Sequence, residues 1–215
     1  MQDYICINGK QIPLTDDQVM QIQTAWAGEK KCNSISEKGK KKLEDIPVGG
    51  LFKLAGYEFI VLEHTQEGTA VISKGIIGSK TKFGEKNDYK GSYVEAICNS
   101  LSEPLEQEAG EDAIVGHVVD LTSDDGLDDY GMVKCKVSLM TADQYRKYVR
   151  ILDKHKVNDW WWLATPFSTY THDHETCVKC VSPAGDFNFG ICNYVGGGVR
   201  PFCILKSSIF VSYGQ

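Results

Sequence analysis

Short apolar runs separated by turn residues predict β-strands over most of residues 48–140. The first three runs, which are close enough to form an antiparallel meander, are Leu51–Leu54, Tyr57–Glu63 and Thr69–Ser73. Two further strands are predicted at Ala113–Leu121 and Met132–Met140. The last quarter of the chain predicts strands and loops without a helix, with strands at Cys177–Ser182, Asp186–Ile191 and Phe202–Val211.

Capping motifs mark the helices between these strands. Ser92 lies three residues before Glu95, and Thr141 lies three residues before Gln144, as in a capping box. Apolar residues then recur at helical spacing behind each motif. The main domain is therefore predicted to be α+β, mainly antiparallel sheet with two to three helices.

The N-terminal region has the pattern of a separate small unit. Asn8-Gly9 lies between two short apolar runs and suits the type I′ turn of a hairpin. Thr15-x-x-Gln18 then predicts the start of a helix. We therefore expect a hairpin and helix at residues 1–30, a basic linker at residues 31–47 and the main domain at residues 48–215.

Charge and hydropathy narrow the class of protein. The chain has 215 residues and a formal net charge of −6 at pH 7, which argues against a general nucleic-acid binder. Its apolar runs are far shorter than the about 20 residues of a membrane span, and its N-terminus does not resemble a signal peptide. We expect a cytoplasmic protein that contacts neither membrane nor nucleic acid directly, with its eight cysteines reduced.

The sharpest chemical pattern is His172-x-His174-x-x-Cys177-x-x-Cys180. Imidazole and thiolate are preferred zinc ligands, and Cys-x-x-Cys is a common spacing in zinc sites. In an extended strand Cys177 and Cys180 point to opposite faces, whereas a turn would bring both to one metal. One prediction is therefore that these residues bind zinc, with Cys192 or Cys203 as substitute ligands. The other is that the protein binds no cofactor.

Motifs of the common catalytic classes are missing, including the Gly-x-Ser-x-Gly elbow, the phosphate-binding loop and His-Glu-x-x-His. A Cys-His pair stays open, since nucleophile and base need only meet in space. The acidic connection from Asp120 to Asp129 lacks the ligand spacing of an EF-hand, which favours a solvated turn over a calcium site. The sequence thus favours a protein that is not an enzyme.

For several bulky side chains near the C-terminus, the sequence predicts a structural role. Trp160 and Trp162 are expected in the core, with Trp161 nearer the surface. Arg200 is expected to pair with a buried carboxylate, with an anion nest at the preceding glycines as the alternative. Phe187 and Phe189 share one strand face that is either packed or exposed.

Three late segments carry a family resemblance: WWWLATPFST (160–169), CVSPAG (180–185) and GVRPFCI (198–204). They resemble an uncharacterised domain family that is widespread in phages and prophages of Gram-positive gut bacteria, and VDLTSDDG (119–126) is similar to the same group. The resemblance implies a C-type lectin-like fold, shared by phage receptor-binding proteins and by formylglycine-generating enzymes. Those enzymes use a late cysteine pair, for which Cys192 and Cys203 are the candidates.

In that fold a rigid β-scaffold presents loops near the C-terminus, where binding function is usually found. The resemblance therefore implies a binding surface, whose residues are Tyr170, Asp173, Glu175, Asp186, Asn188, Asn193 and Tyr194. Asn188, Asn193 and Tyr194 are expected to be exposed, since adaptable amides and rigid aromatic rings are typical of binding loops.

Together these patterns predict a non-enzymatic phage or prophage accessory protein that binds another protein. Its acidity favours a basic target, such as a host nucleic-acid-binding defence nuclease, which would make it an anti-CRISPR type of inhibitor. The alternatives are a receptor- or glycan-binding display module of a virion and a zinc-dependent or Cys-based enzyme. The oligomeric state stays open.

Overall fold

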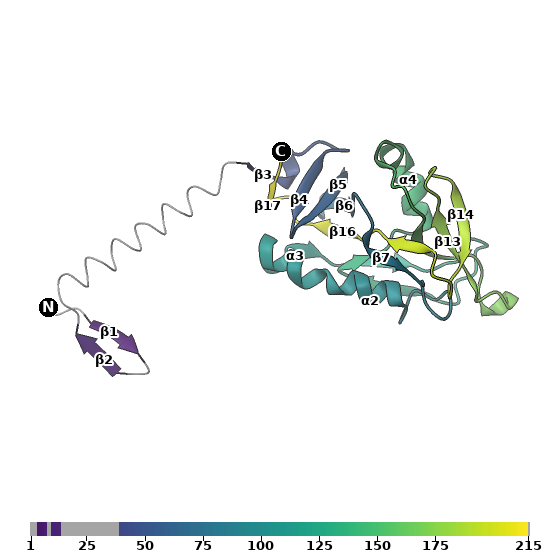
Figure 1. Cartoon of the computed structure of the whole chain (residues 1–215), viewed down its shortest axis with the longest axis horizontal. Coiled ribbons are helices and arrows are strands. Elements are labelled where there is room, and N and C mark those ends of the chain that lie inside the picture. Colours follow the sequence, from purple (N-terminus) through teal and green to yellow (C-terminus); the bar gives the residue numbers. More distant parts are fainter. Residues whose placement is uncertain (1–3, 8–9, 14–38, 215) are drawn as a thin grey trace. The chain divides into compact units, whose positions relative to one another are not determined.

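The structure, a computed structural model, describes residues 4–7, 10–13 and 39–214. The chain divides into two compact units, Met1–Lys40 and Lys41–Gln215 (Figure 1). In the first unit, β1 (Tyr4–Ile7) pairs antiparallel with β2 (Lys10–Pro13), which confirms the predicted hairpin. The helix predicted after Thr15 lies outside the described residues, as does most of the predicted linker.

The second unit begins earlier than the expected residue 48. Lys40–Lys42 form the short strand β3, and Leu43–Asp45 form the 3-10 turn η1. Leu43 and Ile46 are fully buried in the core of this unit. The end of the lysine-rich segment is thus part of the domain, because two apolar side chains anchor it.

The larger sheet of the second unit has eight strands. Its order is β11-β16-β6-β5-β4-β17-β3, and β8 also pairs with β16. Besides β3, its strands are β4 (Leu51–Leu54), β5 (Tyr57–His64), β6 (Thr69–Ser73), β8 (Ile114–Val115), β11 (Val137–Ser138), β16 (Phe202–Leu205) and β17 (Phe210–Ser212). The strands β4, β5 and β6 pair antiparallel in sequence order, which confirms the predicted meander.

The smaller sheet has five strands in the order β14-β13-β12-β15-β7. These strands are β7 (Ile77–Thr81), β12 (Trp161–Pro166), β13 (Cys177–Val181), β14 (Phe187–Ile191) and β15 (Gly197–Val199). Its β12–β15 pair is parallel and its other pairs are antiparallel. A separate hairpin pairs β9 (His117–Asp120) with β10 (Met132–Cys135).

Three α-helices lie in the described residues: α2 (Tyr93–Ser100), α3 (Ser102–Ala109) and α4 (Ala142–Leu152). Ser92 Oγ accepts from Glu95 N–H at the start of α2, and Thr141 with Gln144 forms a complete capping box at α4. Short 3-10 turns follow at η2 (Asp153–His155) and η3 (Tyr170–His172). The α+β class with mainly antiparallel sheet is confirmed, and none of the described helices is long and apolar enough to cross a membrane.

The central strand β12 separates two hydrophobic cores. Trp162 belongs to the larger core with Phe83, and Trp161 belongs to the second core with Tyr145 of α4. Trp161 and Trp162 are 2% and 3% exposed, whereas Trp160 is 37% exposed. The expectation that Trp160 is buried and Trp161 lies near the surface is wrong, because both faces of β12 are covered.

Arg200 is 1% exposed, but no carboxylate pairs with it in the described part of the chain. Its Nε and Nη2 donate to the Ser73 carbonyl at 3.2 and 3.0 Å, and its guanidinium lies 4.8 Å from the ring centroid of Trp161. Burial lowers the pKa of Arg200 to about 10. The predicted carboxylate partner is thus wrong: backbone carbonyls and an aromatic face take its place.

Candidate functional site

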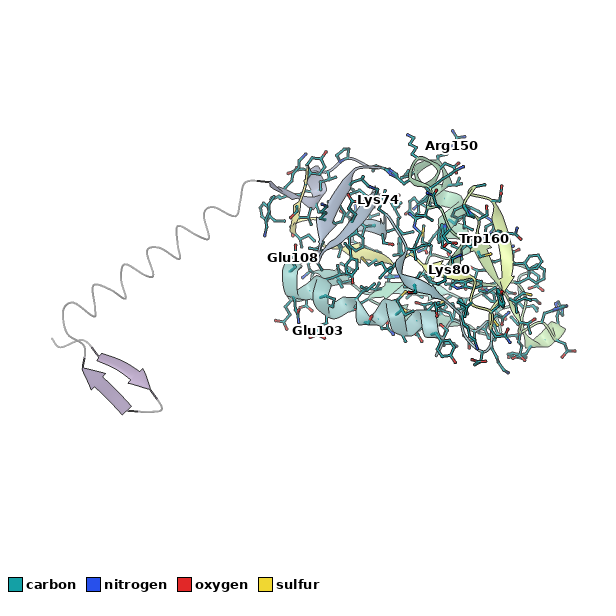
Figure 2. All side chains as sticks on the ribbon, in the orientation of Figure 1. Lys74, Lys80, Glu103, Glu108, Arg150 and Trp160 are labelled. Carbon is teal, nitrogen blue, oxygen red and sulfur yellow. The ribbon has the colours of Figure 1, made fainter. Side chains whose placement is uncertain are left out.

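An open groove of about 320 Å³ lies on the smaller sheet, and we call it the aromatic groove. Its lining residues come from β12 and the residue before it, from β13 and β14, and from the start of β15 and the loop that precedes it: Trp160, Trp162, Cys180, Phe189, Gly190, Ile191, Tyr194, Gly196 and Gly197. Figure 2 labels Trp160 close to Lys80, in agreement with the ion pair of 2.8 Å between Lys80 and Asp159. Its volume lies in the lower part of the range of ligand-binding clefts, and aromatic and other apolar residues line most of it.

Glycines allow the floor of the groove to form. A Cβ on Gly190 would lie 2.9 Å from the Trp162 ring, and a Cβ on Gly197 would lie 2.5 Å from it. Both approaches are closer than real side chains allow, so the indole of Trp162 can lie against these strands only because both residues are glycine. Trp162 Nε1 donates to the Thr81 carbonyl at 3.1 Å, which fixes the ring.

The groove and the strand β14 beside it expose several large apolar side chains. Tyr194 is 71% exposed, Ile191 56% and Phe189 51%. Within the described residues, neither Tyr194 Oη nor Trp160 Nε1 makes an intramolecular hydrogen bond, so both are available to a ligand. Exposed apolar side chains gathered on one surface are typical of an interaction site.

Four of the seven predicted binding residues belong to this region. Asn188 and Asn193 are exposed, as Tyr194 is, which confirms the placement expected for these three. Asp186, also exposed, precedes β14 and receives a hydrogen bond from Ser182 Oγ. These residues lie next to one another along β14 and the turn that follows it.

The other predicted binding residues, Tyr170, Asp173 and Glu175, lie in the loop of residues 167–176, which we call the tethered loop. Tyr170 and Asp173 are exposed. Glu175 is half-buried, and its carboxylate pairs with Lys86 at 2.8 Å. The sequence-based prediction placed these residues in one binding surface with those of the groove. In the structure, however, several side chains of the tethered loop are hydrogen-bonded to other parts of the protein.

Carboxylates of the acidic connection hold the tethered loop in place. Asp125 Oδ2 accepts from Ser168 Oγ at 2.6 Å and lies 3.0 Å from His172 Nδ1. Asp129 accepts a hydrogen bond from Thr169 Oγ1. The expectation of a solvated turn at this connection is therefore incomplete, because its carboxylates bind a loop about 40 residues away in sequence.

The pKa of Asp125 reflects this role. Burial alone would raise the pKa, but the hydrogen bonds from Ser123, Ser168 and His172 outweigh burial and lower the pKa to about 2. Ser168, His172 and Asp125 are not arranged as a catalytic triad, because the Ser168 hydroxyl (3.4 Å) and the Asp125 carboxylate (3.0 Å) approach the same ring nitrogen, His172 Nδ1, and Ser168 is buried.

Asn87 is the main anchor of the tethered loop, and no pattern in the sequence marks it as one. It is fully buried, and its Nδ2 donates to the carbonyls of Ser168, His174 and Cys177 at 2.9, 3.0 and 2.7 Å. Its Oδ1 accepts from Tyr130 Oη at 2.8 Å. A buried amide with this many partners fixes a loop without any regular secondary structure.

The predicted zinc ligands are not brought together. His172 faces Asp125, and the His174 ring packs edge-on against Phe167. Cys177 and Cys180 lie three residues apart in β13, which is a strand rather than the turn that a shared metal requires. Within the residues that the structure describes, no three His, Cys, Asp or Glu side chains could hold a metal ion.

The five thiols that the structure shows as buried are poorly suited to nucleophilic chemistry. Burial raises the pKa of Cys98 and Cys203 to about 12, and that of Cys135 and Cys180 to about 11. Burial also raises the pKa of Cys192, the second member of the candidate late pair. Because the thiolate is the reactive form, little of it exists at neutral pH at these positions.

Comparison with known proteins gives no family for this chain. No family model, no curated protein and no solved structure matches it. The site is therefore interpreted from its own geometry.

Proposed function

We propose that the protein is a non-enzymatic binding protein that recognises another protein through the aromatic groove and the strand β14 beside it. The observation that carries the proposal is the exposure of four large apolar side chains in one region: Trp160 and Tyr194 at the groove, and Phe189 and Ile191 on the strand β14 beside it. A rigid sheet underneath them reduces the entropy lost on binding. Aromatic anchors of this kind dominate the binding energy of many protein interfaces.

The target we propose is a basic surface of a host nucleic-acid-binding defence protein. The net charge of −6 favours a basic partner and speeds the encounter with it. The resemblance of the C-terminal segments to a phage and prophage family supports a role as an accessory protein that inhibits a defence nuclease. A cytoplasmic location is part of the same proposal.

The finer fold assignment belongs to this proposal as well. A C-type lectin-like arrangement is supported by the central tryptophan strand β12 and by the Gly198-Val199-Arg200-Pro201 segment, which follows directly on the groove. Both segments build the sheet that carries the exposed rim. In such a fold, a sheet near the C-terminus presents the binding loops.

Glycan recognition is the second candidate function. Trp160 and Tyr194 offer exposed aromatic faces, and Asn193 adds an amide beside them. An aromatic face packs against the apolar face of a sugar ring, and amides bond to its hydroxyls. This arrangement would serve a display module of a virion.

The test compares two double variants of the full chain. Trp160→Ala with Tyr194→Ala removes the rim of the groove, and Val118→Ala with Met132→Ala removes two exposed apolar side chains of the β9–β10 hairpin as a matched control. Affinity purification from host lysate should recover a basic nucleic-acid-binding protein with wild type and control, but not with the groove variant. Equal recovery with all three proteins would refute the proposal, and binding to a glycan array alone would favour the second candidate.

A further inference from the structure

Strand β14 presents an edge of the smaller sheet. Within the described residues it pairs with β13 alone. At its two ends Ser182 N–H donates to the Asp186 carbonyl, and Cys192 N–H donates to the Thr176 carbonyl. Because hydrogen-bonded pairs alternate along an antiparallel ladder, the even-numbered residues of β14 face β13. The backbone groups of Phe187, Phe189 and Ile191 therefore point away from the sheet.

Two of these outward groups are already occupied. Asn188 Oδ1 accepts from Phe189 N–H at 2.9 Å, and the Ile191 carbonyl accepts from Tyr194 N–H at 3.2 Å. In the described part of the chain, the N–H groups of Phe187 and Ile191 and the carbonyls of Phe187 and Phe189 have no protein partner. A strand added at this edge would form its backbone hydrogen bonds to donors and acceptors spaced in this way.

The usual protections of an edge strand are missing from β14. Its sequence, FNFGI, contains neither proline nor a charged residue, and its pairing with β13 shows no bulge. Phe189 and Ile191 are nevertheless more than half exposed. Proteins normally protect apolar edges against association, so an unprotected one indicates a surface that another chain covers.

The charges around β14 indicate what kind of chain covers it. Lys86, Arg146 and Lys179 lie near the strand, and each is paired with a carboxylate. The exposed carboxylate of Asp186, directly before the strand, has no basic partner among the described residues. The surroundings of the edge are therefore acidic and fit a basic segment.

A second copy of this chain fits the edge less well. In a symmetric antiparallel pairing centred on Phe189, Asp186 of one copy would lie opposite Cys192 of the other. At the centre of this pairing, the Phe189 N–H of each copy is occupied by its own Asn188 Oδ1, so two hydrogen bonds of the ladder would be lost. Both copies also carry the same net charge of −6, which disfavours their association.

We propose that β14 binds an extended, basic segment of the partner protein as an added strand. The proposal rests on the proposed function and specifies how its partner is held. Alternate side chains of the added strand would lie on the groove side, with Tyr194, and on the opposite side, where Phe189 packs against Phe167 at 4.9 Å. The segment should thus alternate apolar residues and carry Lys or Arg near its ends.

The test uses a displayed library of random dodecapeptides, selected on the full chain. Selected peptides should alternate apolar residues and carry basic residues near their ends. The best peptide is then synthesised in two forms, each N-methylated at every second residue. An extended peptide directs successive N–H groups to opposite sides, so one form should lose binding by about tenfold or more, while the other binds within about threefold of the parent.

Several results would overturn strand addition. Equal binding of both methylated forms would show that side chains alone are recognised; if the groove variant still abolished binding, the proposed function would stand without this inference. The absence of any selected peptide, or the absence of basic residues in those selected, would count against it. A dimer in light scattering that the peptide does not dissociate would assign the edge to a second copy, and binding to glycans alone would refute both proposals.

Asn188 provides a second measurement on the protein side. Its side chain occupies the Phe189 N–H, so Asn188→Ala should free one donor and tighten binding of the selected peptide by about twofold to tenfold. Asn99→Ala, which removes an exposed amide of α2 that is not among the binding residues, is the control and should leave the affinity unchanged. Weaker binding of Asn188→Ala would contradict an edge role for this residue.

Discussion

The tethered loop and the turn of residues 192–196 were both predicted to bind ligands, yet their side chains are used in different ways. In the tethered loop, Ser168, Thr169 and His172 are bound to carboxylates of the acidic connection. In the turn, Asn193, Tyr194 and Val195 are exposed. The hydroxyl and imidazole side chains of the first region thus stabilise the fold, whereas the exposed side chains of the second region are free to bind a partner.

The two regions differ because backbone polar groups that are removed from water need hydrogen-bond partners. A loop outside a sheet must satisfy its backbone groups, and Asn87 does so for the Ser168 and His174 carbonyls of the tethered loop and for the Cys177 carbonyl at the start of β13. The turn after β14 is short and satisfies itself, with Tyr194 N–H bonded to the Ile191 carbonyl. Its side chains are therefore not needed for the fold.

The largest expected effect comes from removing the anchor of the tethered loop. Asn87→Ala leaves the carbonyls of Ser168 and His174 and the Tyr130 hydroxyl without their partner, so we expect a loss of about 2–4 kcal/mol in the free energy of unfolding. Urea unfolding measures this loss. Asn193→Ala is the matched control in the turn and should stay within about 0.5 kcal/mol of wild type. An unchanged midpoint for Asn87→Ala would show that the loop is not tethered in this way.

A smaller effect is expected from filling the floor of the groove. Gly197→Ala places a Cβ 2.5 Å from the Trp162 ring and should cost about 1–3 kcal/mol. Gly196→Ala is the control, because its Cβ would lie 3.4 Å from the Tyr194 ring, an ordinary contact. Thermal unfolding and tryptophan fluorescence report the two changes. Equal stability of both variants would mean that Trp162 does not lie against β15 as described.

The helices and strands of the main domain could be predicted well where a local sequence motif determines them. The capping motifs at Ser92 and Thr141 are local, and both helices begin where these motifs place them. The burial of Trp161 could not be predicted, because it depends on helix α4 packing over the second face of β12. Alternation within one strand cannot show that both of its faces are covered.

The candidate site was predictable only in part, for a similar reason. Exposure of Asn188, Asn193 and Tyr194 followed from residue type and position in a late loop. Asn87 lies in a polar stretch of the chain, about 80 or more residues from the carbonyls it binds, and nothing in its neighbours marks it. The partner of Arg200 was missed because a buried guanidinium can bind carbonyls as well as a carboxylate.

Acid should weaken the tethered loop before it affects the turn. The pKa of Asp125 in the folded protein is about 2, against 3.8 as its ordinary value, so ionised Asp125 stabilises the folded state above about pH 4. That contribution is lost as the pH falls from about 4 to 2. Asp125→Asn should remove it, so stability of the variant should fall less steeply over this range than that of wild type. Parallel curves from urea unfolding would contradict the assignment.

The smallest expected effect on stability belongs to the residue with the largest expected effect on binding. Tyr194 is 71% exposed and makes no side-chain hydrogen bond within the described residues, so Tyr194→Ala should change the free energy of unfolding by no more than about 0.5 kcal/mol. The same variant should bind the partner at least about tenfold more weakly, because it removes an aromatic anchor of the groove rim. Urea unfolding and titration of the partner, measured on one preparation, separate the two effects. A variant that loses stability as well as binding would place Tyr194 with the tethered loop, among side chains that serve the fold.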